Sequence, residues 1–213
     1  VTAIAGHRAT PAMVHFSSKA VSRTQPMKTP NPIRTFSLIA SLIAGLGALQ
    51  AAPAPAPTTL LPLKAVGTQI LDSRNQPVRL RGVNAASLEW TSDGEGHILQ
   101  TVNVAIRDWR VNVIRLPLAQ DRWFGKAPEQ TDGGTAYRAL VQQVVDACAT
   151  QNCYLILDLH WSDCNEWGAN IGQHSMPDLN SVTFWKDVAP LYANHPAVLF
   201  DLYNEPHDVS WDV

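Results

Sequence analysis

The sequence predicts an α/β fold in which parallel strands alternate with helices, as in the first four βα units of a (β/α)8 TIM barrel. Four apolar runs of strand length are separated by segments whose apolar residues recur three or four positions apart. Continuous apolar strands with helices between them indicate a parallel sheet that is covered by helices. A doubly wound open sheet shows the same alternation and remains the structural alternative.

A β-hairpin is expected ahead of this alternation. Residues 66–71 and 77–81 have the composition of strands, and the polar residues 72–76 between them have that of a turn. The first core strand is expected at residues 80–84. The spaced glycines of a phosphate-binding loop do not follow it, which argues against a nucleotide-binding fold.

The other elements continue the alternation to the last strand. In order, they are a helix at 98–109, a strand at 111–117, a helix at 136–148, a strand at 154–160, a helix at 184–192 and a strand at 198–203. Pro117 is expected to close the second core strand, and Pro190 to kink or end the third helix, because proline lacks a backbone N–H.

Composition and charge indicate a globular chain. Of the 213 residues, 46% are hydrophobic and 16% are charged, which is enough apolar material for one core. The formal net charge of −2 is too small for an acidic tail or a face that binds nucleic acid. We therefore expect no nucleic-acid partner.

Residues 27–52 have the layout of a secretory signal peptide. The basic residues Lys28 and Arg34 precede an apolar run at residues 36–49, and small residues follow that run. The run is short for a membrane span. We expect secretion to the extracellular space or a periplasm, with no stable membrane association after cleavage; an uncleaved membrane anchor is the alternative.

The leader divides the chain into parts. Residues 1–26 show no sustained periodicity, so Met27 is the expected start, with a real N-terminal extension as the alternative. Residues 53–59 are expected to form a stiff linker rich in proline and alanine. The folded part is expected at residues 60–213.

Three cysteines allow at most one internal disulfide and leave one thiol over. Cys148 and Cys153 flank the expected turn between a helix and a strand, so they are the favoured pair, with buried free thiols as the alternative. Cys164 would then be the remaining thiol. A zinc site is not expected, because no second paired motif is present.

Polar side chains occur near the ends of all four core strands. Asn84 ends the first strand, Arg115 is near the end of the second, His160 ends the third, and Asn204 and Glu205 follow the fourth. In a parallel barrel the carboxyl ends of the strands meet on one face, where the chemistry is placed. We therefore expect these side chains to form a site.

Each residue type in this set has a defined chemistry. A glutamate such as Glu205, held beside an apolar wall, has a raised pKa and can donate a proton near neutral pH. Arg115 is a permanent cation that can orient a carboxylate. His160 and Asn204 can form hydrogen bonds with hydroxyl groups. This combination is suited to proton transfer on a hydroxyl-rich substrate.

Aromatic and acidic residues near the same strand ends have two interpretations each. Trp161, with Trp90 and Trp167, can stack on sugar rings or simply pack in the fold. Asp158 precedes His160 by two residues and so allows an Asp-x-His metal site. No third ligand is evident, so we expect no metal.

In its strand-end motifs the chain resembles glycoside hydrolase family 5, the large cellulase-type family. The matching segments, in the family's order and spacing, are residues 80–84, 112–117, 155–160 and 200–207. The resemblance covers residues 66–213, and the Asn204-Glu205-Pro206 motif is its most specific part. It implies a (β/α)8 barrel and retaining hydrolysis of a β-linked glycan, without a cofactor.

The resemblance also implies residue roles. Glu205 matches the family's general acid/base, and Asn204 its neighbour that contacts the sugar 2-hydroxyl. Arg115 matches the arginine near the nucleophile, and His160 the active-site histidine of the third strand. The family's nucleophile lies on a seventh strand that has no counterpart in this sequence, so the chain is expected to be an N-terminal half without activity of its own.

Several functions remain open at this point. The expected substrate is β-1,4-glucan, with mannan or another β-glucan as alternatives. A barrel that binds glycans without cleaving them, or a metal-dependent hydrolase that uses Asp158 and His160, is also compatible with the sequence. Glu89 and Glu166 follow the first and third strands and are expected to line the cleft or face solvent, rather than serve as a nucleophile.

Overall fold

The computed structural model of the chain describes residues 60–210 and residue 212. The expected extension at residues 1–26, leader at 27–52 and linker at 53–59 lie outside the described residues. Within the described part, no helix combines the length and apolar character that crossing a bilayer requires.

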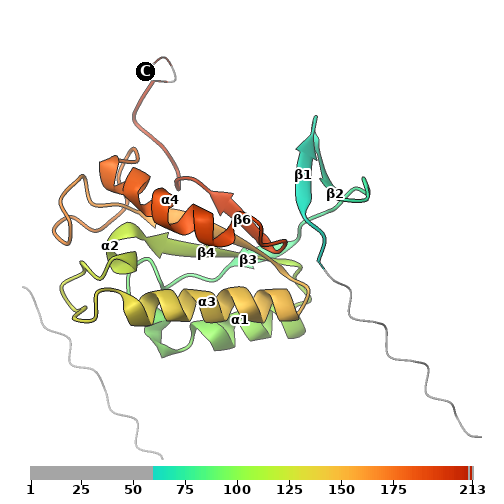
Figure 1. Cartoon of the computed structure of the whole chain (residues 1–213), viewed down its shortest axis with the longest axis horizontal. Coiled ribbons are helices and arrows are strands. Elements are labelled where there is room, and N and C mark those ends of the chain that lie inside the picture. The colour runs from blue at the N-terminus through green and yellow to red at the C-terminus, as the bar shows by residue number, and fades with distance from the viewer. Residues whose placement is uncertain (1–59, 211, 213) are drawn as a thin grey trace, which may run out of the picture. The chain divides into compact units, whose positions relative to one another are not determined.

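A parallel sheet of four strands forms the centre of the described part (Figure 1). The strands are β3 (Gly82–Asn84), β4 (Val113–Ala119), β5 (Tyr154–Trp161) and β6 (Val198–Asp201). Each strand pairs in parallel with the next one along the chain, in the order β3-β4-β5-β6. This sequential order is that of successive strands in a barrel, whereas a doubly wound sheet reverses its order at a switch point.

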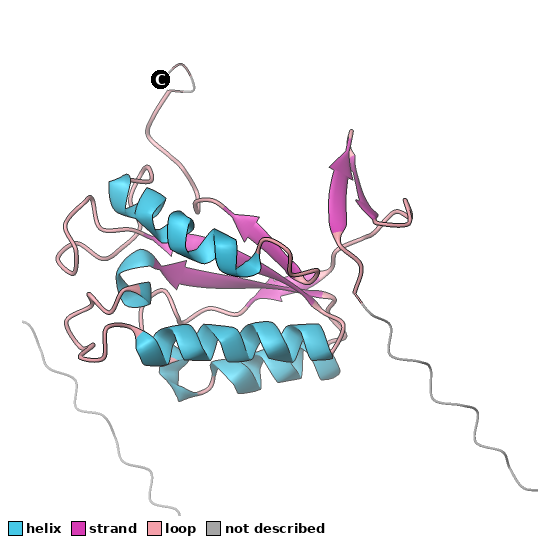
Figure 2. Ribbon diagram, in the orientation of Figure 1, coloured by secondary structure: helices cyan, strands magenta, loops and turns pink. Residues whose placement is uncertain are grey.

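Helices connect the strands, as expected (Figure 2). They are η1 (Gly94–Gly96), α1 (Ile98–Arg107), α2 (Gln120–Trp123), α3 (Thr135–Thr150) and α4 (Leu179–Tyr192). The short helix α2 was not predicted. Trp109, expected on the apolar stripe of the first helix, lies beyond the end of α1 and is 67% exposed.

The two faces of the sheet have different roles. On β5, Leu155, Leu157 and Leu159 are fully buried and share one core with apolar residues of α1, α3 and α4. The residues that alternate with them, Asp158 and His160 among them, point to the opposite face, which we call the inner face. In a closed barrel the inner face lines the interior.

A hairpin forms one strand earlier than the one predicted, although the expected turn at residues 72–76 is present, with the N–H of Asp72 donating to the Gln76 carbonyl at 2.9 Å. Strands β1 (Leu63–Val66) and β2 (Gln69–Asp72) pair around a turn at Gly67, which has a φ of 58°. Glycine adopts this left-handed conformation without strain, and tight hairpins require it. The expected second strand at residues 77–81 is reduced to an isolated bridge between Leu71 and Pro77.

Neither proline ends its element where the sequence suggested. Strand β4 continues through Pro117 to Ala119. Strand β3 ends at Asn84, opposite Arg115, so β4 has only one neighbouring strand at Pro117 and the missing N–H is tolerated. Pro190 lies inside the last turn of α4, which continues to Tyr192.

The favoured disulfide is absent, because all three cysteines are free thiols. Cys148 and Cys153 are buried, and a hydrogen bond with Cys153, together with burial, raises the pKa of Cys148. This outcome matches the alternative of buried free thiols. Cys164 is the exposed one of the three.

Candidate active site

Arg115 is the centre of a polar cluster on the inner face. Its Nε and Nη2 atoms donate to Oδ2 of Asp201 at 3.0 and 2.9 Å, and Nη2 also donates to Oδ1 of Asn204 at 2.9 Å. The same Nη2 lies 3.0 Å from Oδ1 of Asp158. Arg115 lies within β4 rather than near its end, but its long side chain brings three separate segments together.

Asp158 links this cluster to His160. The residue is fully buried, and its Oδ2 lies 2.6 Å from Nδ1 of His160. A carboxylate beside Nδ1 favours a proton on that nitrogen and so directs Nε2 away from the cluster. Burial raises the pKa of Asp158, while His160 and Arg115 oppose that rise.

One oxygen of Asp158 is poorly satisfied. Oδ1 has no well-aligned hydrogen bond to any of the described residues, although it lies 3.0 Å from Arg115. The reason is that Arg115 directs its N–H groups at Asp201 and Asn204. The ion pair is therefore electrostatic in nature, and Asp158 depends on Arg115 to balance a buried charge.

Asn204 is held in a fixed orientation. Its side chain donates from Nδ2 to Oε1 of Gln173 at 2.8 Å, and Gln173 Nε2 returns a bond to the Asn204 carbonyl at 2.9 Å. Its backbone N–H donates to the Leu159 carbonyl at 2.9 Å. These bonds, with the one from Arg115, leave the amide no freedom to flip.

The segment that carries Asn204 is not strand, which corrects the expected strand at residues 198–203. Strand β6 ends at Asp201, and Leu202 leaves the sheet with 69% of its surface exposed. Pro206 therefore does not end the strand. Glu205 has a φ of 45°, in the left-handed region, where a residue other than glycine is strained.

Glu205 follows this fixed asparagine but is not part of the cluster. It is exposed, and its carboxylate forms no hydrogen bond with the described residues. Asn84 is likewise exposed, at the end of β3 and opposite Arg115 in the strand register. The structure thus brings Arg115, His160 and Asn204 together and leaves Glu205, the residue after Asn204, exposed and outside the cluster.

Trp161 forms an aromatic pair with Trp90. The ring centroids are 6.5 Å apart at an interplanar angle of 51°, and Trp90 is 42% exposed. Trp167 belongs elsewhere, because it packs edge-on against Phe124 with centroids 5.3 Å apart. Exposed aromatic surface at a strand end suits contact with the apolar faces of sugar rings.

Glu89 is buried, which corrects the expectation that this residue lines the cleft or faces solvent. Only 3% of the residue is exposed, and its Oε2 accepts the N–H of Ser87 at 2.8 Å. Burial raises the pKa of Glu89, against the influence of that hydrogen bond and of His160. Glu166 is exposed, as one of the expected alternatives had it.

Asp201 and Gln173 are the site residues that the sequence analysis missed. Asp201 pairs in register with Asp158 and so lies on the inner face beside Arg115. A single aspartate inside an apolar strand was an available signal. Gln173 lies 31 positions from Asn204 in a loop, and no spacing rule connects the two.

The metal alternative lacks support from the donor set. Among the described residues, no group of three histidine, cysteine, aspartate or glutamate side chains is placed to hold a metal ion. Asp158 and His160 contact each other and Arg115, so a cation already occupies the position beside the carboxylate.

A second polar network fixes the loop at residues 162–178, which we call the β5–α4 loop. Gln120 Nε2 donates to Asp163 and Asp178, and the backbone N–H of Gly168 donates to Asp121 Oδ1 at 2.6 Å. Asp121 is fully buried, and burial raises its pKa to about 7. This network positions the loop that supplies Gln173.

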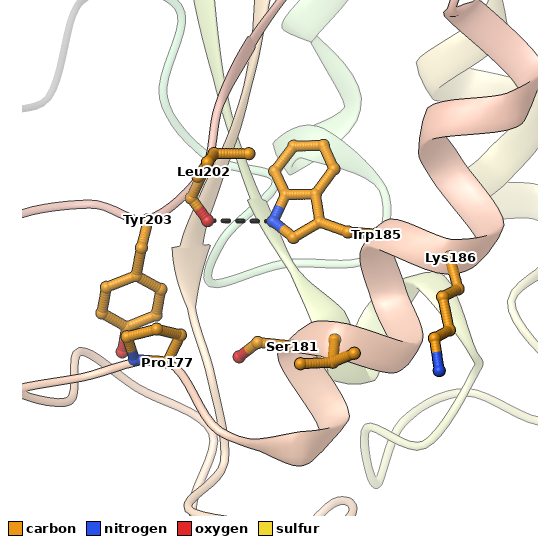
Figure 3. Close-up of a pocket in the computed structure, with 7 residues that line it drawn as sticks. Pro177, Ser181, Trp185, Lys186, Leu202 and Tyr203 are labelled. Atoms are coloured by element: carbon orange, nitrogen blue, oxygen red, sulfur yellow. Dashed lines mark hydrogen bonds between the residues drawn. The ribbon is translucent and has the colours of Figure 1, made fainter.

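Two hollows differ in chemistry. One, of about 410 Å³, lies between α4 and the segment that follows β6, and it is mostly apolar. There Trp185 donates from Nε1 to the Leu202 carbonyl at 2.9 Å (Figure 3). The other, of about 230 Å³, lies on the inner face and is lined by Gly82, Asn84 and Arg115 among others. Only the second of these two shares a residue with the cluster, namely Arg115, and neither is lined by His160, Asn204 or Glu205. We therefore take the cluster itself as the candidate site, rather than either hollow.

Comparisons with known proteins agree with this geometry. The family described as cellulase (glycosyl hydrolase family 5) matches residues 71–213. Endoglucanase MaCel5A of a Microbulbifer species is 26% identical over 150 residues, which cover 70% of this chain and 27% of the relative. Endoglucanase 1 of Saitozyma flava is 30% identical over 187 residues, covering 84% of this chain and 50% of the relative.

Solved structures show the same fold. Cellulase Cel5C_n superposes with a TM-score of 0.55 at 24% identity, covering 76% of this chain and 49% of the other. The β-glucanase SdGluc5_26A of Saccharophagus degradans gives a TM-score of 0.55 at 23% identity, covering 76% and 51%. The chain thus spans about half or less of the proteins that it matches, and its sheet is part of a (β/α)8 barrel. By the family match and the fold together, the chain belongs to glycosyl hydrolase family 5.

Proposed function

We propose that the chain is part of a secreted, retaining endo-type glycoside hydrolase that cleaves β-linked polysaccharide, as cellulases and endoglucanases do. The observation that carries this proposal is the clamp on Asn204, the residue directly before Glu205, which ties it to Arg115 and Gln173. A retaining mechanism needs a proton donor and groups that hold the sugar in a fixed geometry around it.

In this mechanism Glu205 is the general acid/base. It donates a proton to the glycosidic oxygen as the leaving group departs, and later takes a proton from the attacking water. Asn204 positions a sugar hydroxyl, and His160 supplies a further hydrogen-bonding group. The exposed carboxylate of Glu205 is free to reach the glycosidic oxygen, because no described residue engages it.

The nucleophile requires a second carboxylate about 5 Å from the first. Asp158 and Asp201 lie on the inner face, but Arg115 holds both of them in ion pairs, which lowers their ability to attack. We therefore expect the nucleophile to lie outside the described residues. The polar cluster would then orient that carboxylate through Arg115.

The favoured substrate is β-1,4-glucan, with mannan and other β-glucans behind it. Two of the similar proteins are named as endoglucanases, and a related β-glucanase was solved with cellotetraose. The Trp90–Trp161 pair offers an aromatic surface for a glucosyl ring beside the site.

The test compares hydrolysis by two proteins. One is the full-length protein, by which we mean the complete hydrolase of which this chain is a part, and the other is residues 60–213 alone. Soluble β-1,4-glucan and mannan are the substrates, and proton NMR follows the anomeric configuration of the first product. We expect the full-length protein to release β-anomers from glucan and the shorter chain to be inactive. Inversion of configuration, turnover by residues 60–213 alone, or binding without hydrolysis would each contradict the proposal.

Secretion has its own test, because the leader lies outside the described residues. Cleavage is expected near Ala51 and Ala52, where small residues follow the apolar run. N-terminal sequencing of the exported protein would show this start. A mature protein that still begins at Val1 or Met27 would exclude a cleaved leader.

A further inference from the structure

Cys164 and His174 form a thiol–imidazole pair in the β5–α4 loop. The Cys164 Sγ lies 3.0 Å from Nδ1 of His174, which is hydrogen-bond distance for a sulfur atom. The pair is separate from the Arg115 cluster, and the proposed mechanism does not use it. It is also the thiol that the sequence leaves over after the two buried cysteines.

The second ring nitrogen determines how the pair is protonated. His174 Nε2 lies 2.6 Å from the backbone carbonyl oxygen of Asn170. A carbonyl only accepts, so Nε2 carries a proton, and in the neutral ring Nδ1 is a lone pair directed at the thiol. The imidazole can therefore take the proton of Cys164, and the Asn170 carbonyl also stabilises the resulting imidazolium.

Exposure separates Cys164 from the other two thiols. Cys148 and Cys153 are both buried, whereas Cys164 is open to solvent. Its backbone is held in place, because the N–H of the next residue, Asn165, donates to carboxylate oxygens of Asp163 and Asp178 at 3.0 and 3.1 Å. Cys164 is the nucleophile, His174 is the base, and the Asn170 carbonyl orients the histidine. Such an arrangement activates cysteines in enzymes.

We propose that Cys164 is a site of thiol–disulfide exchange with small-molecule disulfides, with His174 as its base. The Cys164 proton moves to His174 Nδ1, and the thiolate forms a bond with one sulfur of the incoming disulfide. The old sulfur–sulfur bond breaks, and the leaving thiolate takes the proton back from the imidazolium. The products are a mixed disulfide on Cys164 and one small thiol, so atoms and electrons balance.

A mixed disulfide on Cys164 can affect the inner face, because His174 and its neighbour Gln173 contact the segment that carries Asn204. The carbonyl of His174 accepts the hydroxyl of Tyr203 at 2.9 Å, and the preceding residue, Gln173, holds Asn204. An adduct that displaces His174 would therefore disturb the segment leading to Asn204. The exchange reaction itself does not depend on the proposed glycosidase function.

The experiment labels the folded full-length protein at pH 7 with 5,5′-dithiobis(2-nitrobenzoate), an aromatic disulfide. Release of the coloured thiol gives the rate, and mass spectrometry of peptides identifies the cysteine that carries the adduct. We expect the peptide containing Cys164 to react first, and those of Cys148 and Cys153 only after denaturation. Cys164→Ser should remove the fast phase.

The role of the base is tested with His174→Asn. The control is His97→Asn, because His97 is an exposed histidine whose ring pairs with Glu95 rather than with a thiol. Ionising a thiol fully at pH 7 raises its reactive fraction by up to about thirtyfold, and a lower intrinsic nucleophilicity offsets part of that gain. We therefore expect His174→Asn to slow labelling roughly three- to tenfold and His97→Asn to leave it unchanged.

Three results would overturn the proposal. They are equal labelling rates for wild type and a folded His174→Asn variant, a Cys164 that reacts no faster than the buried thiols, and a native disulfide between Cys164 and another cysteine of the full-length protein. The peptide map of the wild type remains decisive if the histidine variant does not fold.

Discussion

Replacing Arg115 with methionine should strongly destabilise the folded protein, because it leaves a buried carboxylate without a cation. Breaking a buried ion pair from one side costs about 3–5 kcal/mol. Asp158 is fully buried and dominates this cost, whereas Asp201 has 39% of its side chain exposed and contributes less. His160 remains beside Asp158, so we expect a loss near the lower limit, about 3 kcal/mol at pH 7.

The loss should shrink as the pH falls. Burial raises the folded-state pKa of Asp158, so between about pH 4 and that raised pKa the native state binds more protons than the unfolded state, and stability falls as the pH rises through this range. Removing Arg115 removes an influence that lowers the Asp158 pKa, so the fall in stability continues to a higher pH in the variant. The gap between variant and wild type is therefore largest at neutral pH and narrows on acidification.

Urea unfolding of the full-length protein at pH 5 and pH 7 measures both effects. Arg107→Met is the control, because Arg107 donates on the surface to Gln151 and should change stability by less than about 0.5 kcal/mol. Adding Asp158→Asn to Arg115→Met should restore much of the loss by removing the unpaired charge. Two results would refute the reasoning. One is a loss of unfolding free energy below about 1 kcal/mol for Arg115→Met at pH 7, and the other is a double variant that is less stable than Arg115→Met alone.

The same contacts support three more predictions. Gln173→Leu should lower kcat on polysaccharide about tenfold with little change in unfolding temperature, because Asn204 loses its clamp; an unchanged kcat would show that the clamp is not needed. Asp121→Asn should raise stability at pH 8 by roughly 1–2 kcal/mol and have little effect near pH 4, since the Asp121 pKa of about 7 makes the native wild type lose stability between those values; urea unfolding at both pH values checks this. Phe184→Ala should cost about 3–5 kcal/mol in urea unfolding, because the ring packs on Trp123 and Trp185, whereas Leu179→Ala, at a 75% exposed position, should cost less than about 0.5 kcal/mol.

The regular elements of the sheet were predictable because their signal is local. Strand β5 was predicted to within one residue. Its leucines face the core, and the residues between them begin with an isoleucine, so the whole run is of strand type. Helix α3 followed from apolar spacing and extends one or two residues beyond the expected ends. Periodicity reports which side of an element is buried, and that information was sufficient for both elements.

The misplaced elements depended on conditions that periodicity does not report. The hairpin turns at Gly67 because that residue adopts a positive φ. Pro117 is tolerated within β4 because the neighbouring strand β3 ends before it. Both facts concern the neighbouring chain or the backbone angle rather than the composition of the segment.

Three of the site residues could be predicted from the sequence, but the hydrogen bonds and ion pairs that hold them could not. Arg115, His160 and Asn204 were identified from their places at the strands, and they do come together. The partners that hold them, Asp201 and Gln173, are distant in sequence, and their contacts depend on strand register and on the path of the β5–α4 loop. Such contacts leave no periodic trace in one sequence.

The measurement that tests the central claim most directly compares Glu205→Gln with wild type on two substrates. Unactivated β-glucan needs a proton on its leaving oxygen, whereas an aryl glycoside with an acidic phenol does not. If Glu205 is the acid, the full-length variant should lose several orders of magnitude in kcat/KM on glucan and retain far more activity on the aryl glycoside. An equal loss on both substrates would contradict the assignment of Glu205 as the proton donor.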